Sequence, residues 1–276
     1  MAQPLSFRAG FARNLLFEFA LLSTSVLAFL FLTWWAAGKQ YLPGEEQWLA
    51  AIIAARQPVL TLPAQLLSAL GSMNVLLPLW VIVVAALALK RQVMALLTFL
   101  PIPLGYPLDA ALKTLVGRAA PAPAQYPWIH DLSFGYYLEG LARRQVQQLP
   151  PQGVSVPAVS QPVTAQAVTQ VIATGFPSGH ALLAMLFYAT VAYWLWKSGP
   201  AGFWRIAGTA LVASLAFLPG IARVYMGVHF PSDVLGAWLL APAFLIVAYR
   251  LARWVERRWV PSKHQLSFPC ATARER

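Results

Sequence analysis

The chain has 276 residues, of which 59% are hydrophobic and only 11% are charged. Soluble globular domains carry about 25% charged residues, so this composition excludes an ordinary soluble domain. The formal net charge of +11 would indicate nucleic acid binding in a soluble protein, but here the cations lie between long apolar runs. That arrangement is typical of membrane topology, and we expect no nucleic acid partner. The single cysteine, Cys270, permits no internal disulfide.

The apolar runs predict an all-α integral membrane protein with six transmembrane helices in one bundle. Crossing the hydrocarbon core takes about 20 mostly apolar residues. Such runs lie at residues 15–36, 73–89, 93–112, 181–196, 203–218 and 234–249. The first run follows Arg8 and Arg13, is too long for a signal-peptide core and lacks a clear cleavage site, so we expect a retained helix. Pro101, Pro103 and Pro107 are expected to kink or break the third span.

Two features near the N-terminal half are expected to lie at the membrane interface. Residues 45–70 are mixed in character and contain Pro58 and Pro63, which favours an interfacial segment over a span. Glu18 interrupts the first apolar run near its polar end. We expect its carboxylate to reach back to the interface, and a buried functional acid is the alternative.

Residues 119–175 form the one long polar stretch of the sequence, between the third and fourth spans. Within it, Phe134, Leu138 and Leu141 recur at helical spacing, which predicts a short helix lying on the membrane surface. Residues 145–170 are rich in Pro, Gln, Ser, Val and Thr and are expected to be irregular. We therefore predict a single membrane domain over residues 1–260, with an outer-side loop or lid at 119–175. A polar cytoplasmic tail follows at 261–276.

The distribution of lysine and arginine sets the expected topology. Six spans place both termini on one side of the membrane. Thirteen of the 20 cations lie on that side. The other seven are Lys39, Arg56, Lys113, Arg118, Arg143, Arg144 and Arg223. The positive-inside rule then places the termini in the cytoplasm and the opposite face outside, as in a multi-pass protein of a bacterial inner membrane.

Polar residues that an apolar chain would otherwise avoid gather at three predicted span ends on the outer side. They are Lys113 and Arg118 after the third span, Ser178, Gly179 and His180 before the fourth, and Arg223, His229 and Asp233 between the fifth and sixth. Ionisable groups at the membrane edge are costly, so each is a functional candidate. Cations would repel a metal ion, and no His, Asp or Glu cluster has ligand spacing for magnesium or zinc. We expect an oxyanion site with no metal and no cofactor.

Three motifs are recognisable among these residues. Residues 177–180 read Pro-Ser-Gly-His, and Arg223 is followed after five residues by His229 and after three more by Asp233. Lys113 begins the remaining motif. Together they resemble the type 2 phosphatidic acid phosphatase (PAP2) superfamily, which also contains glucose-6-phosphatases and vanadium haloperoxidases. The predicted spans exclude a soluble haloperoxidase.

The sequence departs from the family pattern at two positions. The serine that precedes the arginine of the last motif is replaced by Ala222, and the arginine of the first motif is replaced by Ala120. Arg118, two residues earlier, is the nearest substitute, and we expect it to contact the phosphate beside Lys113. The second candidates are the two arginines of the predicted surface helix, Arg143 and Arg144.

The resemblance implies a catalytic role for three residues. His229 is the nucleophile that takes the phosphoryl group, and Asp233 accepts a hydrogen bond from its other ring nitrogen, which favours the reactive tautomer. His180 protonates the leaving oxygen and afterwards activates water.

Phosphate binding is expected to fall to the remaining motif residues, because phosphoryl transfer depends on positioning and distributed positive charge. Arg223 offers a planar fork to two oxygens, and Lys113 offers a point charge. The backbone around Gly179 opens the fourth span, and a helix N-terminus is a natural anion site. The Ser178 hydroxyl is a further donor.

Each residue taken singly also has a structural interpretation. His180 alone would be a cap or an interface residue. Asp233 follows Pro231 closely and would serve as a helix N-cap. Asp109 lies four residues before Lys113, and an i,i+4 ion pair would account for that lysine. Only the combination at family spacing favours chemistry.

The predicted function is hydrolysis of a lipid phosphate monoester or diphosphate, with the headgroup presented from the outer leaflet among other membrane lipids. Candidate substrates are undecaprenyl diphosphate, phosphatidylglycerol phosphate, phosphatidic acid and lipid A phosphates. The alternative is a lipid phosphotransferase or headgroup synthase, in which an acceptor hydroxyl replaces water; the altered first motif favours it. A third hypothesis, a non-catalytic transporter or scaffold, conflicts with the complete set of His180, Arg223, His229 and Asp233.

Overall fold

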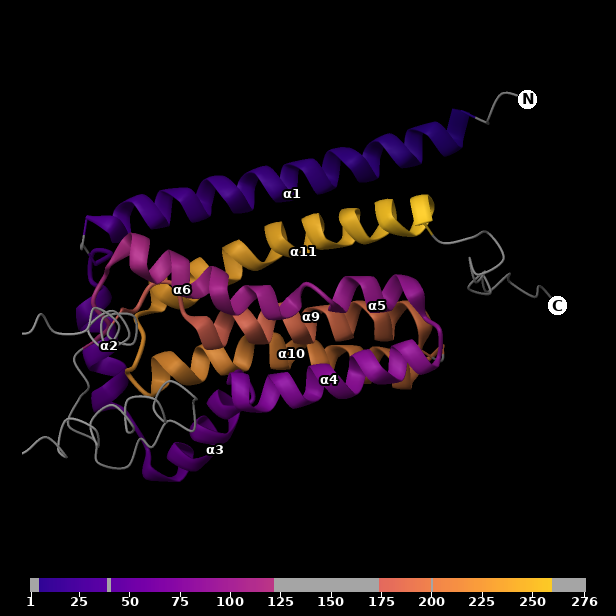
Figure 1. The fold of residues 1–276 in the computed structure, drawn as a ribbon. Helices are drawn as coiled ribbons and strands as arrows, with labels where there is room; N and C mark the ends of the chain where they lie inside the picture. The colour runs from indigo at the N-terminus through magenta and orange to yellow at the C-terminus, as the bar shows by residue number, and fades with distance from the viewer. Residues whose placement is uncertain (1–4, 39–40, 122–173, 200, 260–276) are drawn as a thin grey trace, which may run out of the picture.

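The computed structural model describes residues 5–38, 41–121, 174–199 and 201–259. Apart from one β-bridge between Ala119 and Thr174, the regular structure in these ranges is helical (Figure 1). The helices are α1 (Leu5–Ala37), α2 (Glu45–Ala54), α3 (Pro58–Ala69), α4 (Met73–Leu89), α5 (Val93–Phe99), the 3₁₀ helix η1 (Ile102–Leu104), α6 (Gly105–Val116), α9 (Gly179–Ser198), α10 (Phe203–Tyr225) and α11 (Pro231–Trp259). The predicted surface helix, Arg143, Arg144 and the tail 261–276 lie outside the described residues.

Within the described residues, five helical segments are long and apolar enough to cross a membrane: Glu18–Ala37, Val93–Val116, Gly179–Ser198, Phe203–Tyr225 and Pro231–Trp259. They coincide with five of the six predicted spans. The remaining predicted span is α4, whose 17 residues rise about 25 Å, which is short of the roughly 30 Å hydrocarbon core. With α3, bent by 47° against it, α4 forms a pair that passes as one broken span.

Prolines break the segment Val93–Val116 where the sequence predicted. Pro101 and Pro103 lie between α5 and α6, with Pro103 inside η1. Pro107 lies in the first turn of α6, where a missing backbone N–H leaves no helical bond unmade. Despite the break, α5, η1 and α6 together pass as one candidate span, Val93–Val116.

Helix α9 forms the centre of the bundle. Leu182, Ala184 and Leu186 are completely buried, as expected of a helix that is apolar on every side and surrounded by other helices. A side-chain hydrogen bond joins α9 to its neighbour α5: the indole of Trp194, in α9, donates to Thr98 Oγ1 at 2.8 Å. Such hydrogen bonds link helices where lipid provides no hydrophobic drive for association.

Figure 1 shows the start of α1 and the end of α11 at one end of the bundle and α2 at the opposite end. Helices α9 and α11 begin, and α6 ends, at the α2 end. Helix α6 stops at Gly117, whose φ of 63° lies in the left-handed region and turns the chain back toward the bundle. The three predicted motifs therefore meet at this end.

The structure bears on two expectations for the N-terminal half. Residues 45–70 form two helices that pack on the bundle: Ala64 of α3 packs with Ala222 and Met226, and the Arg56 Nε donates to the Tyr225 carbonyl at 2.7 Å. Helices α2 and α3 thus pack at the end of the bundle that carries the motifs. Glu18 forms an ion pair with Arg250 of α11, and the position of its carboxylate at the membrane interface stays a prediction.

Candidate active site

Backbone hydrogen bonds hold the three motifs together. The Ser178 N–H donates to the Asp233 carbonyl at 3.0 Å, which ties the start of α9 to the start of α11. The Gly175 N–H donates to the Arg118 carbonyl at 2.8 Å, next to the bridge between Ala119 and Thr174. Residues separated by more than a hundred positions therefore form one local unit.

Asp233 and His229 form a buried pair at the start of α11. Asp233 is completely buried and His229 is 5% exposed. The Asp233 Oδ2 lies 3.3 Å from His229 Nδ1 and accepts the Phe230 N–H at 2.9 Å. Pro231 takes the first helical position and places Asp233 in the first turn, facing back toward the histidine. A carboxylate at Nδ1 fixes a proton there and leaves the Nε2 lone pair for chemistry.

The environment of His229 favours its neutral form. Burial lowers the pKa of His229 below the ordinary 6.5; the hydrogen bond that His229 donates to Asp233 opposes this shift, and the charge of Arg223 adds to it. The imidazole is consequently unprotonated at neutral pH, as a nucleophile must be.

Lys113 reaches the same end of the bundle from α6. Its Nζ forms an ion pair with Asp109 Oδ2 at 2.9 Å, the i,i+4 pair that the sequence allowed. This pair lies against the start of α9, because a Cβ on Gly179 would fall 2.6 Å from Asp109 Oδ2. Gly179 is therefore required for the close approach of α6 and α9.

The remaining predicted phosphate-binding residues and the predicted catalytic His180 lie at the same end of the bundle. Ser178 is completely buried, and its Oγ has no hydrogen-bond partner within the described part of the chain. Arg223, near the end of α10, is 7% exposed, and its Nη1 lies 3.5 Å from Ser68 Oγ of α3. His180 is half-buried in the first turn of α9. A hydroxyl, a guanidinium and a helix N-terminus are groups that bind phosphate oxygens.

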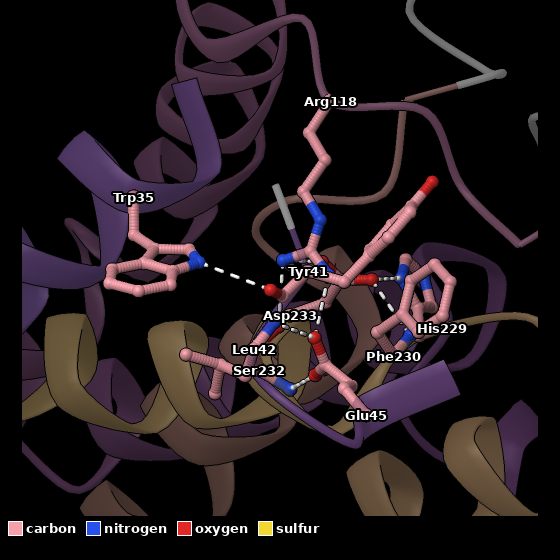
Figure 2. Close-up of polar contacts among 9 residues, drawn as sticks. All are labelled: Trp35, Tyr41, Leu42, Glu45, Arg118, His229, Phe230, Ser232 and Asp233. Atoms are coloured by element: carbon pink, nitrogen blue, oxygen red, sulfur yellow. Dashed lines mark hydrogen bonds and ion pairs between the residues drawn. The ribbon is translucent and has the colours of Figure 1, made fainter. Parts of the chain in front are cut away.

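Arg118 is placed differently from the expectation that it joins Lys113 at the phosphate. It is 2% exposed, and both terminal nitrogens bond to groups of the protein (Figure 2). Nη1 donates to Ser232 Oγ at 2.6 Å and lies 3.3 Å from Asp233 Oδ1, and Nη2 donates to Glu45 Oε2 at 3.0 Å. Phosphate binding by Arg118 stays a prediction, and these contacts favour another role.

Glu45 is the site-adjacent residue that sequence reasoning missed. It is 2% exposed at the start of α2, and its Oε1 accepts the Ser232 N–H at 2.6 Å. In the sequence it stands beside Glu46, and two acids in the first turn of a helix are an ordinary terminal signal. Only the fold distinguishes the buried glutamate from its neighbour.

Comparison of the sequence with known proteins shows the family to which the chain belongs. The family model described as the PAP2 superfamily matches residues 92–257, which contain every predicted site residue. The chain belongs to the PAP2 superfamily. It is 30% identical over 192 residues to phosphatidylglycerophosphatase B of Bacillus subtilis (strain 168), covering 69% of this chain and 74% of that protein. The resemblance seen in the motifs is thereby confirmed, and the chain joins a family of membrane phosphatases of lipid metabolism.

A solved structure supports the fold. The crystal structure of the first transmembrane PAP2 type phosphatidylglycerolphosphate phosphatase from Bacillus subtilis superposes with a TM-score of 0.58 at 26% identity. The match covers 86% of this chain and 98% of that one. An all-helical, multi-pass membrane protein is therefore confirmed.

Proposed function

We propose that this chain is a membrane lipid phosphatase that hydrolyses a phosphate monoester or diphosphate through a phosphohistidine on His229. The observation that carries the proposal is the buried His229–Asp233 pair, held beside Arg223 and the start of α9. Phosphatidylglycerol phosphate is the first substrate to test, because the relatives bear that activity in their names. Undecaprenyl diphosphate, phosphatidic acid and lipid A phosphates are the other candidates.

In the reaction that we propose, the two histidines have separate roles. His229 Nε2 attacks phosphorus while His180 gives a proton to the departing lipid oxygen, which leaves as an alcohol, or as a phosphate when the substrate is a diphosphate. Water then attacks the phosphohistidine, gives its proton to His180, and releases inorganic phosphate and neutral His229. Asp233 holds the Nδ1 proton throughout and stabilises the charge on the phosphorylated ring.

Groups around the His229–Asp233 pair stabilise the negative charge of the phosphoryl group during transfer. Lys113 and Arg223 supply positive charge, and Ser178 and the backbone at Gly179 supply hydrogen-bond donors. These groups are fixed by helix ends before substrate arrives. Such preorganisation is the main source of rate in phosphoryl transfer.

The proposed topology has six spans, with α3 and α4 together forming the second. Residues 1–260 then make one domain, both termini and the 261–276 tail lie in the cytoplasm, and 119–175 is the outer-side loop. The site opens to the periplasmic face of a bacterial inner membrane. The excess of lysine and arginine at the termini end supports this orientation.

The alternative is a phosphotransferase, favoured by Ala120 at the family's arginine position. The deciding experiment measures inorganic phosphate released from a panel of lipid phosphates by detergent-purified protein, with and without an acceptor lipid. Hydrolysis predicts phosphate release without acceptor, and none from the His229→Ala variant. Consumption of lipid phosphate only in the presence of acceptor, with phosphate recovered on that acceptor, would establish the transferase.

A further inference from the structure

We propose that Glu45 and Arg118 are positioning residues that act through Asp233 to hold the nucleophile His229. The inference rests on the proposed function, since it assigns the residues that prepare its nucleophile. Figure 2 shows these four side chains in a continuous line of polar contacts. None of the four is more than 5% exposed.

The two oxygens of the Asp233 carboxylate contact different partners, because Arg118 lies beside one of them. Oδ1 faces Arg118 Nη1 at 3.3 Å, and Oδ2 faces His229 Nδ1 at 3.3 Å while accepting the Phe230 N–H. The ion pair on Oδ1 and the contacts of Oδ2 with Phe230 and His229 together disfavour rotation of the carboxylate about its bond to Cβ. Oδ2 is therefore the oxygen presented to the imidazole.

Arg118 also balances the charge of Asp233. The Asp233 side chain is completely buried, and the guanidinium lies 3.3 Å from its Oδ1. A buried charge that loses its partner is strongly destabilising. Arg118 therefore lets a carboxylate face His229 from inside the protein.

Glu45 in turn holds Arg118 and the start of α11. Its Oε2 accepts Arg118 Nη2 at 3.0 Å and the Leu42 N–H at 3.0 Å, while Oε1 accepts the Ser232 N–H at 2.6 Å. Ser232 lies in the first turn of α11, where a carboxylate is favoured by the exposed N–H groups and the helix dipole. Glu45 thus fixes the guanidinium to the same helix turn that carries Asp233.

Aromatic rings complete the cage around the guanidinium. The Tyr41 and Phe230 ring centres lie 5.1 and 5.0 Å from Arg118 Cζ, within range of cation–π attraction. Tyr41 precedes Glu45 in the chain, and Phe230 precedes Asp233. The same two segments therefore supply both the ionic and the aromatic contacts of Arg118.

The test is a double-mutant cycle that reads the rate of lipid phosphate consumption, which either hydrolysis or transfer produces. Arg118→Lys and Glu45→Gln are made in the wild type and in an Asp233→Asn background. If both residues act through Asp233, each lowers kcat by at least about tenfold in the wild type and by less than about threefold once Asp233 is neutral. Equal losses in both backgrounds would overturn the proposal.

Two further readouts separate positioning from phosphate binding and from folding. KM and the inhibition constant for vanadate should stay within about threefold in the single variants; a large rise in both with kcat unchanged would make Arg118 a phosphate ligand and overturn the proposal. Arg250→Lys and Glu18→Gln are the controls, because they alter an Arg–Glu pair whose arginine lies 17 residues beyond Asp233 along α11. If the controls lose kcat as Arg118→Lys and Glu45→Gln do, the effect is general destabilisation and the proposal fails.

The outcomes also separate this inference from the proposed function. His229→Ala protein that still consumes lipid phosphate would refute the phosphohistidine mechanism itself. Inactive His229→Ala protein together with additive losses at Arg118 and Asp233 would refute only the positioning role.

Discussion

Gly179→Ala should slow the enzyme without unfolding it. A Cβ at this position would lie 2.6 Å from Asp109 Oδ2, so the carboxylate must retreat by roughly 0.8 Å to restore an ordinary contact of 3.4 Å. Asp109 carries Lys113 through a 2.9 Å ion pair, so the lysine moves with it or loses its partner. Misplacing a catalytic group by about 1 Å costs about 100-fold. We expect kcat for lipid phosphate hydrolysis to fall by about 10- to 100-fold.

The free energy of unfolding should change little. The new Cβ meets only the end of the Asp109 side chain, and alanine has a higher helix propensity than glycine. Gly208→Ala is the matched control: it lies within α10, and its new Cβ would meet only Leu195 Cδ2 at 3.3 Å. Phosphate release and thermal unfolding would be measured on both purified variants. A Gly179→Ala rate within about threefold of wild type, or a loss equal to that of Gly208→Ala, would refute the argument that close approach at Gly179 serves catalysis.

Three other outcomes follow from the site. Activity should persist in EDTA and be inhibited by vanadate, since the phosphate-binding cations are side chains; loss in chelator with recovery on adding magnesium would contradict this. His229→Ala should abolish turnover and any trapped phosphoenzyme, whereas Asp233→Asn should leave an enzyme slower by up to about 10⁴-fold; a near-normal His229→Ala rate would disprove the assignment. The acid limb of kcat/KM should lie below pH 6.5, because burial lowers the pKa of His229 and protonation removes the nucleophile only as pH falls through that value. Asp233→Asn should move the limb lower still, since Asp233 raises this pKa; a limb above 6.5 would contradict the assignment.

The spans were predictable because hydrocarbon imposes a length and a composition that hardly any other environment demands. Five predicted spans coincide with helices that could cross a membrane. The remaining predicted span, at residues 73–89, shows what a search for apolar runs misses. Pro58 and Pro63 made α3 look interfacial, yet Pro58 begins the helix and Pro63 lies inside it, so the apolar path of α4 continues through α3. A proline lowers helix propensity, but the sequence does not reveal whether neighbouring helices satisfy the backbone groups that the proline leaves unbonded.

The motif residues were predictable because phosphoryl transfer needs a fixed set of groups at fixed spacing, and such groups are rare in an apolar chain. Glu45 was not predictable, because its role depends on a partner 73 positions away. Nothing in its local sequence distinguishes it from Glu46. The protein contacts of Arg118 were hidden for the same reason: its spacing from Lys113 suggested a shared phosphate, which stays a prediction, whereas the two side chains that flank the turn at Gly117 pair with different carboxylates.

The two cations of the first motif are paired with different carboxylates, and this difference divides their tasks. Lys113 meets one carboxylate and keeps 15% of its side chain exposed, so an arriving phosphate can share it with Asp109. Arg118 meets Glu45 and Asp233 and keeps 2% exposed, so a phosphate would have to displace buried partners and leave their charges unmatched, at a cost of several kcal/mol. With Ala120 at the family's arginine position, the phosphate charge then falls on Lys113, Arg223 and the N–H groups that open α9. We expect such a site to depend more heavily on each remaining donor.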